Sequence, residues 1–252
     1  MSTRSWTRLR LEEKGPICHL VLARPEAANR IDVAMVRELE EACYYLEDDS
    51  PASLVVVRGS GGCFSEGIDL GEFWLDRPPD THGLHRWEKA LRALERVKKA
   101  TLAVLEGTCR GGGVQLALAC DVRLAAESAR LTLDEVKMGF LPGMATWRLP
   151  KFVGLGRARE LLATGRTVSA REAREIGLVD RVCQDSETDQ ATDRFLADLL
   201  PVNGTALALT RRLLDEAFST PYETAVVNFL AAQSRCITSD PFLQLCRRPP
   251  RD

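Results

Sequence analysis

The sequence predicts an α/β fold with a mostly parallel sheet and a helical C-terminal region, on three observations. Short apolar, β-branched runs alternate with amphipathic helical segments in the first half of the 252 residues. Such alternation is typical of right-handed βαβ crossovers between parallel strands. From Met144 onward helical spacing dominates, and residues 187–246 read as three helices with little strand character. We therefore expect a core over residues 1–186 and a helical region over 187–252.

The individual elements follow from apolar spacing and turn residues. Two β-like runs within residues 7–22 flank Lys14-Gly15-Pro16, which predicts a hairpin. Asp32 precedes apolar residues at helical spacing up to Leu46, which predicts a helix that Asp32 opens. The runs SLVVVRGS (53–60) and TLAVLEG (101–107) are typical of buried strands. Between them we expect a loop at 75–82 and a helix at 84–100.

Two later segments carry the signature of a helix N-terminus. Ser169 is followed three residues later by Glu172, and Thr220 is followed by Glu223 in the same way. This spacing is that of a capping box, and Pro221 suits the first helical position. Both segments are therefore predicted to begin helices.

Composition and charge exclude several classes of protein. A net charge of -2 is not that of a basic nucleic-acid-binding domain. No apolar run approaches the roughly 18–20 residues of a membrane span, and the polar first residues do not resemble a signal peptide. The eight cysteines show no CxxC or CxxH spacing. We expect reduced thiols, no metal site, no nucleic-acid or membrane partner, and a cytoplasmic location.

Three consecutive glycines, Gly111 to Gly113, stand between an apolar strand and an apolar helix. No lysine follows them as in a P-loop, and Leu116 stands where a dinucleotide fingerprint needs glycine. The remaining ligand-binding interpretation is an anion site made of exposed backbone N–H groups at a helix N-terminus. A tight strand-to-helix turn without a ligand is the structural alternative.

The neighbouring motifs resemble those of one enzyme family. LARPEAANRID, FSEGIDL, EGTCRGGGVQLALACDVRLAAESARLTLDEVKMGFLPG and LLATGRTVSAREAREIGLVDRV occur in this order across residues 8–185. Together they resemble the crotonase (enoyl-CoA hydratase/isomerase) superfamily. The resemblance implies a ββα spiral core, an acyl-CoA or acyl-carrier-protein substrate, and a homotrimer or hexamer assembled through the helical C-terminal region. It implies no cofactor other than CoA or phosphopantetheine as the substrate carrier.

The resemblance also assigns roles to the residues of the glycine motif. Two backbone N–H groups, of Ile68 and Gly112, would form an oxyanion hole for the thioester carbonyl. The second glutamate of the family's hydratases matches Glu135, a candidate general acid and base. The first matches Gln115, whose amide cannot accept a proton as a base but can orient water or hold a substrate group.

Other residues are assigned to the thioester carrier by the same resemblance. Arg24, Ala28, Ser65, Glu66 and Ile68 fall on segments that contact CoA in relatives. A solvated arginine is an equal alternative for Arg24, and Glu66 either narrows the CoA channel or faces solvent. His82, His85, Trp74, Trp87 and Trp147 are further candidates for the acyl pocket, with exposed histidines and ordinary core tryptophans as the alternatives.

The single retained glutamate points to a hydratase/dehydratase or a double-bond isomerase. Looser similarities, to polyketide β-branching dehydratases and to the hydratase-type subunit of dihydroxyphenylacetyl-CoA biosynthesis, suggest specialised metabolism. Two alternatives remain at this point. One is a thioester decarboxylase of the same fold. The other is a catalytically weak thioester-binding subunit that assists a polyketide synthase, which the missing first glutamate favours.

Overall fold

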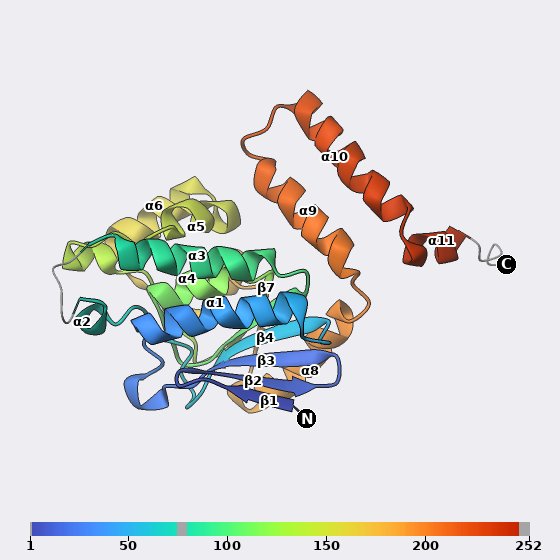
Figure 1. Ribbon diagram of the computed structural model, residues 1–252. Coiled ribbons are helices and arrows are strands. Elements are labelled where there is room, and N and C mark those ends of the chain that lie inside the picture. The colour runs from blue at the N-terminus through green and yellow to red at the C-terminus, as the bar shows by residue number, and fades with distance from the viewer. Residues whose placement is uncertain (1, 75–79, 247–252) are drawn as a thin grey trace. The chain divides into compact units, whose positions relative to one another are not determined.

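The computed structural model describes residues 2–74 and 80–246, and its elements form two compact units (Figure 1). The first unit is Met1–Pro201 and the second is Val202–Asp252. The boundary expected at residue 186 falls inside the first unit. The reason is that helix α8 (Thr188–Leu199) packs against strand β7 (Val122–Ala126) and buries Phe195 and Leu196. The core therefore extends to Pro201.

The larger sheet of the first unit has seven strands in the order β1-β2-β3-β4-β5-β7-β10. Strands β1 to β3 pair antiparallel and strands β3, β4, β5, β7 and β10 pair parallel, so the hairpin and the mostly parallel sheet are confirmed. A second sheet has the order β6-β8-β9. Besides β7, the strands are β1 Ser2–Ser5, β2 Leu9–Lys14, β3 Ile17–Leu22, β4 Leu54–Gly59, β5 Ala100–Leu105, β6 Thr108–Arg110, β8 Arg130–Thr132, β9 Thr167–Ser169 and β10 Arg181–Cys183.

Helices α1 and α3 pack against each other and cover one face of the large sheet (Figure 1). The Asp32 carboxylate accepts a hydrogen bond from Met35 N at 2.7 Å, which confirms the predicted start of α1. The first unit's other helices are α1 Val33–Asp48, α2 Leu70–Phe73, α3 His82–Arg96, α4 Gly112–Leu118, α5 Ala145–Val153, α6 Leu155–Thr164, α7 Ala170–Glu175, and three 3₁₀ turns at Pro25–Ala27, Glu135–Met138 and Asp185–Glu187. The predicted loop at 75–82 lies mostly outside the described residues.

Of the two predicted capping boxes, the structure confirms one. Ser169 Oγ accepts a hydrogen bond from Glu172 N at 3.2 Å at the start of α7. The expectation for Thr220 is wrong, because Pro221 takes the N-cap position of α10 and no side chain caps that helix. Residues 187–246, all of them described, form four helices where three were expected.

The second unit contains helices α9 (Gly204–Glu216), α10 (Tyr222–Ile237) and α11 (Asp240–Cys246). None of the described residues in these helices is buried within the chain. Among the described residues no helix combines the length and the apolarity that crossing a membrane requires.

Candidate active site

Two chain segments meet where the glycine motif joins strand β6 to helix α4. On the first segment, Ile31 N donates to Gly67 O at 2.8 Å, and Asp69 N donates to Ile31 O at 2.9 Å. The N–H of Ile68 lies between these two bonds and has no hydrogen-bond acceptor among the described residues. These two hydrogen bonds therefore fix the Ile68 peptide and leave its N–H available to a ligand.

The second segment supplies an equivalent donor. Gly111 has a φ of +51°, a conformation that favours glycine, and its N–H donates to Thr132 O at 2.9 Å. The next residue, Gly112, begins α4, and its N–H has no acceptor in the described ranges. A Cβ on Gly67 would lie 2.7 Å from Arg110 O and 3.1 Å from Gly112 N, so the two segments touch and only glycine fits between them.

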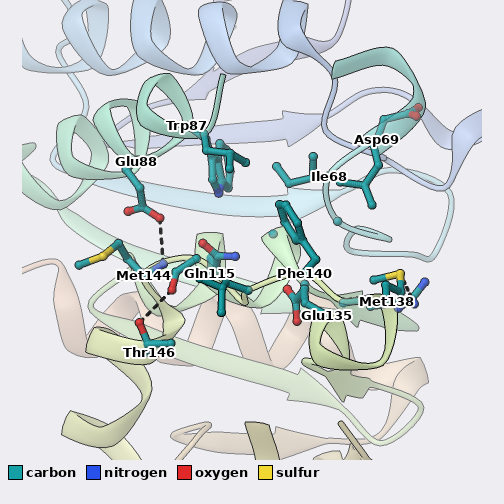
Figure 2. A pocket seen from close by; sticks show the side chains of 18 of the residues that line it. Ile68, Asp69, Trp87, Glu88, Gln115, Glu135, Met138, Phe140, Met144 and Thr146 are labelled. Atoms are coloured by element: carbon teal, nitrogen blue, oxygen red, sulfur yellow. Dashed lines mark hydrogen bonds between the residues drawn. The ribbon is translucent and has the colours of Figure 1, made fainter. Parts of the chain in front are cut away.

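Both donors border a cavity of about 1360 Å³ in the first unit (Figure 2). Most of its wall comes from residues within 66–71, 81–95, 110–115 and 134–148. Figure 2 shows Ile68, Phe140, Trp87, Gln115 and Glu135 arranged around this space. The cavity therefore brings the predicted oxyanion donors, the glutamate and the glutamine to one place.

Glu135 lies on the cavity wall next to the glycine turn. A Cβ on Gly111 would be 3.0 Å from Glu135 Oε1. Glu135 is buried, and its Oε2 has no hydrogen-bond partner among the described residues. Burial raises the pKa of this carboxyl above its ordinary value and the nearby Asp134 charge raises it further, while a hydrogen bond from the backbone of Glu135 itself and the Arg110 charge oppose the rise. A carboxyl in this environment is suited to accept and return a proton.

Arg110 is held by neighbouring carboxylates. Its guanidinium forms two hydrogen bonds with Asp134, at 2.8 and 2.9 Å, and lies 3.8 Å from Glu66. The bidentate pair holds the pKa of Asp134 below its ordinary value. Glu66 also lines the cavity, and its expected role at a CoA channel stays a prediction. Sequence reasoning missed Arg110, although it directly precedes the three glycines.

The chain matches a model of the enoyl-CoA hydratase/isomerase family over residues 12–241. The chain belongs to this family. It is 28% identical to the short-chain-enoyl-CoA hydratase of Clostridium acetobutylicum over 91% of this chain and 89% of that protein. It is 31% identical to the mitochondrial Δ(3,5)-Δ(2,4)-dienoyl-CoA isomerase of Dictyostelium discoideum, over 75% and 70% of the two chains.

A solved structure supports the same assignment. A putative enoyl-CoA hydratase from Thermobifida fusca, crystallised with acetoacetyl-CoA, superposes with a TM-score of 0.81 and 30% identity, over 91% of this chain and 94% of that one. The expected crotonase fold is thereby confirmed. The chain is an enzyme of the enoyl-CoA hydratase/isomerase type.

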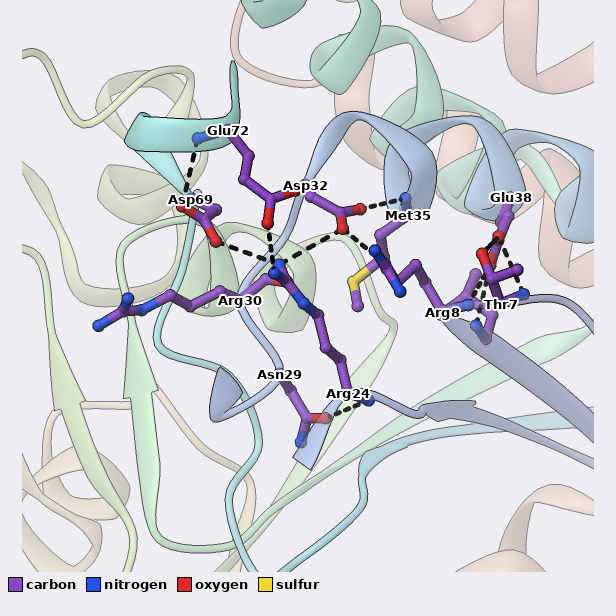
Figure 3. A network of polar contacts seen from close by, with 11 residues as sticks. Thr7, Arg8, Arg24, Asn29, Arg30, Asp32, Met35, Glu38, Asp69 and Glu72 are labelled. Carbon is purple, nitrogen blue, oxygen red and sulfur yellow. Dashed lines mark hydrogen bonds and ion pairs between the residues drawn. The ribbon is translucent and has the colours of Figure 1, made fainter. Parts of the chain in front are cut away.

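In the present enzyme, Arg24 does not line the cavity. Its guanidinium is buried among carboxylates, 3.1 Å from Asp69, 2.6 Å from Glu72 and 3.4 Å from Asp32 (Figure 3). Because these partners already neutralise it, Arg24 is not positioned to bind the phosphates of a carrier. It instead ties the chain after Ile68 to the N-terminal strands. Arg30, on the same segment, does line the cavity.

Ala28 and Ser65 also lie behind the wall, where they hold the donor segment in shape. Ala28 O accepts from Glu66 N at 3.0 Å. Ser65 is buried; its Oγ donates to Asn29 O at 2.8 Å and accepts from Gly67 N at 3.1 Å. Both residues support the loop that presents Ile68.

Of the histidines and tryptophans predicted for the acyl pocket, some line the cavity and others do not. His85, Trp87 and Trp147 line the cavity, whereas His82 and Trp74 do not. Trp74 instead packs edge-on against Phe140, and Phe140 does line the cavity. Sequence reasoning did not single out Phe140, because nothing in its local pattern separates it from ordinary core residues.

We expect Arg24→Met to lower the free energy of unfolding by about 3 kcal/mol, because it leaves the largely buried Asp69 without its cation and leaves buried Asp32 with Arg8 as its one arginine. Glu72→Ala removes an outer, 44% exposed partner of the same guanidinium and should cost less than about 1 kcal/mol. Urea denaturation of both variants measures the difference. Unchanged stability of Arg24→Met together with a raised KM for an acyl-CoA would instead support the carrier-binding role first predicted for Arg24.

Proposed function

We propose that this enzyme acts on acyl-CoA thioesters through an enolate held by the N–H groups of Ile68 and Gly112. Glu135 removes a proton from the α-carbon and either returns it to the γ-carbon or gives it to a β-hydroxyl, which leaves as water. The product is then a shifted double bond, or an enoyl thioester formed by loss of a β-hydroxyl, with hydration as the reverse of that loss. The observation that carries the proposal is a buried carboxylate oxygen beside two backbone donors, all three without a hydrogen-bond partner in the described part of the chain.

The physical basis is electrostatic. Fixed N–H donors stabilise the charge that develops on the thioester oxygen, and one such donor is worth about 2.7–4 kcal/mol. A buried carboxyl with a raised pKa exchanges protons near neutral pH more readily than a solvated one. The named relatives, one a hydratase and one a dienoyl isomerase, carry out chemistry of this kind on CoA thioesters.

Purified enzyme assayed with crotonyl-CoA, a 3-enoyl-CoA and a 3-hydroxyacyl-CoA tests the proposal. Turnover of the 3-enoyl or 3-hydroxyacyl substrate supports it. Binding of acyl-CoA without turnover of any of the three would favour the thioester-binding subunit that assists a synthase. This alternative is considered because Gln115 stands where a second catalytic carboxylate would be. Release of CO₂ from a malonyl-type thioester would indicate decarboxylation.

Two finer aspects of the proposal concern the setting of the enzyme. The exposed apolar side chains of the second unit, which include Phe218, Tyr222, Val227 and Leu230, support assembly as a homotrimer or hexamer, and light scattering checks the mass. A role in specialised metabolism, with acyl-carrier protein in place of CoA, rests on the sequence motifs. Comparing turnover of the same acyl group on both carriers checks it.

We expect Gln115→Glu to raise the rate of water addition to crotonyl-CoA. The glutamine side chain reaches the cavity close to Gly143, where a Cβ would lie 2.7 Å from Gln115 Oε1. A carboxylate of the same shape can accept a proton from water, which an amide cannot. Gln115→Leu, which has neither group, should show no increase. An unchanged hydration rate in folded Gln115→Glu would place Gln115 away from the reacting carbons.

A further inference from the structure

Trp87 and Gln115 line the cavity, and each has a buried polar atom without a hydrogen-bond partner among the described residues. Trp87 Nε1 is a donor and Gln115 Oε1 is an acceptor. Figure 2 shows the indole nitrogen turned toward the Gln115 amide. Because a buried polar atom without a partner is costly, such a pair indicates a ligand group between the two. A hydroxyl or a water satisfies both atoms, since its oxygen accepts a hydrogen bond and its proton is donated.

Gln115 lies beside the proposed proton acceptor. Its N–H donates to Gly111 O at 3.1 Å, so these two residues stand one turn apart at the start of α4. A Cβ on Gly111 would be 3.0 Å from Glu135 Oε1. The Glu135 carboxyl and the Gln115 side chain therefore border the same part of the cavity, as Figure 2 also shows. A hydroxyl held by Gln115 thus lies close to the reacting carbons.

Ion pairs hold the helix that carries Trp87 in place beside the cavity. The buried Arg148 guanidinium pairs with Glu88, the next residue on α3, at 2.8 Å and with Glu95 at 2.7 Å. Glu88 also accepts a hydrogen bond from Met144 N at 3.3 Å. Trp87 itself is 3% exposed. The indole donor is therefore fixed before a substrate binds, and a donor fixed in this way stabilises developing charge most effectively.

We propose that the Trp87 indole N–H is a catalytic donor to the β-oxygen of a 3-hydroxyacyl thioester, so that the enzyme is a dehydratase or hydratase and not an isomerase. The β-oxygen accepts from Trp87 Nε1, and its proton is donated to Gln115 Oε1. A 3-enoyl thioester has no oxygen on its β-carbon and would place hydrocarbon against both polar atoms. This inference rests on the proposed function, because it takes Glu135 and the two backbone donors as the reaction centre.

The dehydration step balances on these groups. Glu135 takes the α-proton as the enolate forms, and the Cβ–O bond then breaks as the carbon–carbon double bond forms. The proton on Glu135 passes to the departing oxygen, which leaves as water together with its own proton. The Trp87 N–H stabilises the negative charge that develops on this oxygen, and Gln115 orients it. Hydration is the same sequence in reverse.

The test compares two thioesters of the same chain length. Both enantiomers of 3-hydroxybutyryl-CoA carry the β-oxygen and are assayed for dehydration. Butyryl-CoA lacks this oxygen, so exchange of its α-protons with deuterated water depends on Glu135 and the backbone donors alone. Trp87→Phe keeps an aromatic ring and removes the N–H. We expect this variant to lower kcat for dehydration at least about tenfold and to change the rate of butyryl-CoA exchange less than about twofold.

Trp74→Phe is the matched control. Trp74 Nε1 already donates to Asp80 O, and the residue does not line the cavity. Both rates of this variant should equal those of the wild type.

Undiminished dehydration by Trp87→Phe overturns the inference, and indicates a bound water that takes no part in the reaction. Equal losses of dehydration and of exchange also overturn it, because they show that the indole has a structural role only. If Trp87→Phe does not fold, the benzothienyl analogue of tryptophan at position 87, which has sulfur in place of the N–H, replaces it in both assays.

The wild type separates this inference from the proposed function. If it exchanges the α-protons of butyryl-CoA but dehydrates neither enantiomer of 3-hydroxybutyryl-CoA, the inference is overturned and the proposed function stands. If the wild type carries out neither reaction, the proposed function is contradicted and the inference with it.

Discussion

Gly112→Pro is expected to lower kcat by at least about a hundredfold, because proline has no N–H and the oxyanion loses one of its two backbone donors. The helix itself should survive the change. Gly112 is the first residue of α4, the position at which proline fits a helix best. Kinetic assay with the preferred substrate, together with a melting curve for the variant, measures both effects.

Gly112→Ala is the control that separates the change at the backbone nitrogen from crowding by a new Cβ. A Cβ at this position meets the flexible ends of Ile68 and Ile31, at 3.1 and 3.2 Å, in both variants, but alanine keeps the N–H. Gly112→Ala should therefore retain far more activity than Gly112→Pro. Equal kcat values for the two folded variants would show that the Gly112 backbone is not part of the oxyanion hole.

The fold was predictable where local pattern and tertiary structure agree. Asp32 caps α1 as expected, and the buried strands β4 and β5 coincide with β-branched runs. The boundary of the core was not predictable in this way, since α8 looks like any amphipathic helix until its contact with β7 is known. Thr220 shows the limit of a capping pattern, because Pro221 and not Thr220 occupies the N-cap position.

The site residues also fall into those that the sequence predicts and those that only the structure reveals. The resemblance to the family locates Gly112, Gln115 and Glu135, because each residue stands within a short contiguous motif. Two of the three carboxylate partners of Arg24, Asp69 and Glu72, lie 45 and 48 residues further along the chain, and no local signal joins them to it. In the same way, the positions of the tryptophans in the sequence do not show that the Trp87 indole nitrogen has no hydrogen-bond partner among residues 2–74 and 80–246. Such properties depend on long-range packing, so they require the structure.

Glu135→Gln is expected to lower kcat by at least about a hundredfold. The change removes the proton acceptor and keeps the size of the side chain, and general acid–base catalysis typically contributes about 10²–10⁴-fold. Binding of the thioester should change little, because its donors, Ile68 N and Gly112 N, lie on other segments. Exchange of the substrate α-proton with deuterated water, followed by NMR, should be lost together with turnover.

The pH dependence of the wild type gives an independent check of the same role. Glu135 acts as a base only when ionised, and burial raises its pKa. The value of kcat/KM should therefore rise with pH through a midpoint above the ordinary glutamate pKa of about 4.3, and this rise should be absent in Glu135→Gln. If Glu135 had only a structural role, its substitution would instead lower thermal stability and weaken binding of the thioester.

Retained α-proton exchange with near-normal kcat in Glu135→Gln would assign the base to another residue. His85, which lines the cavity, would be the next to test, ahead of His82, which does not.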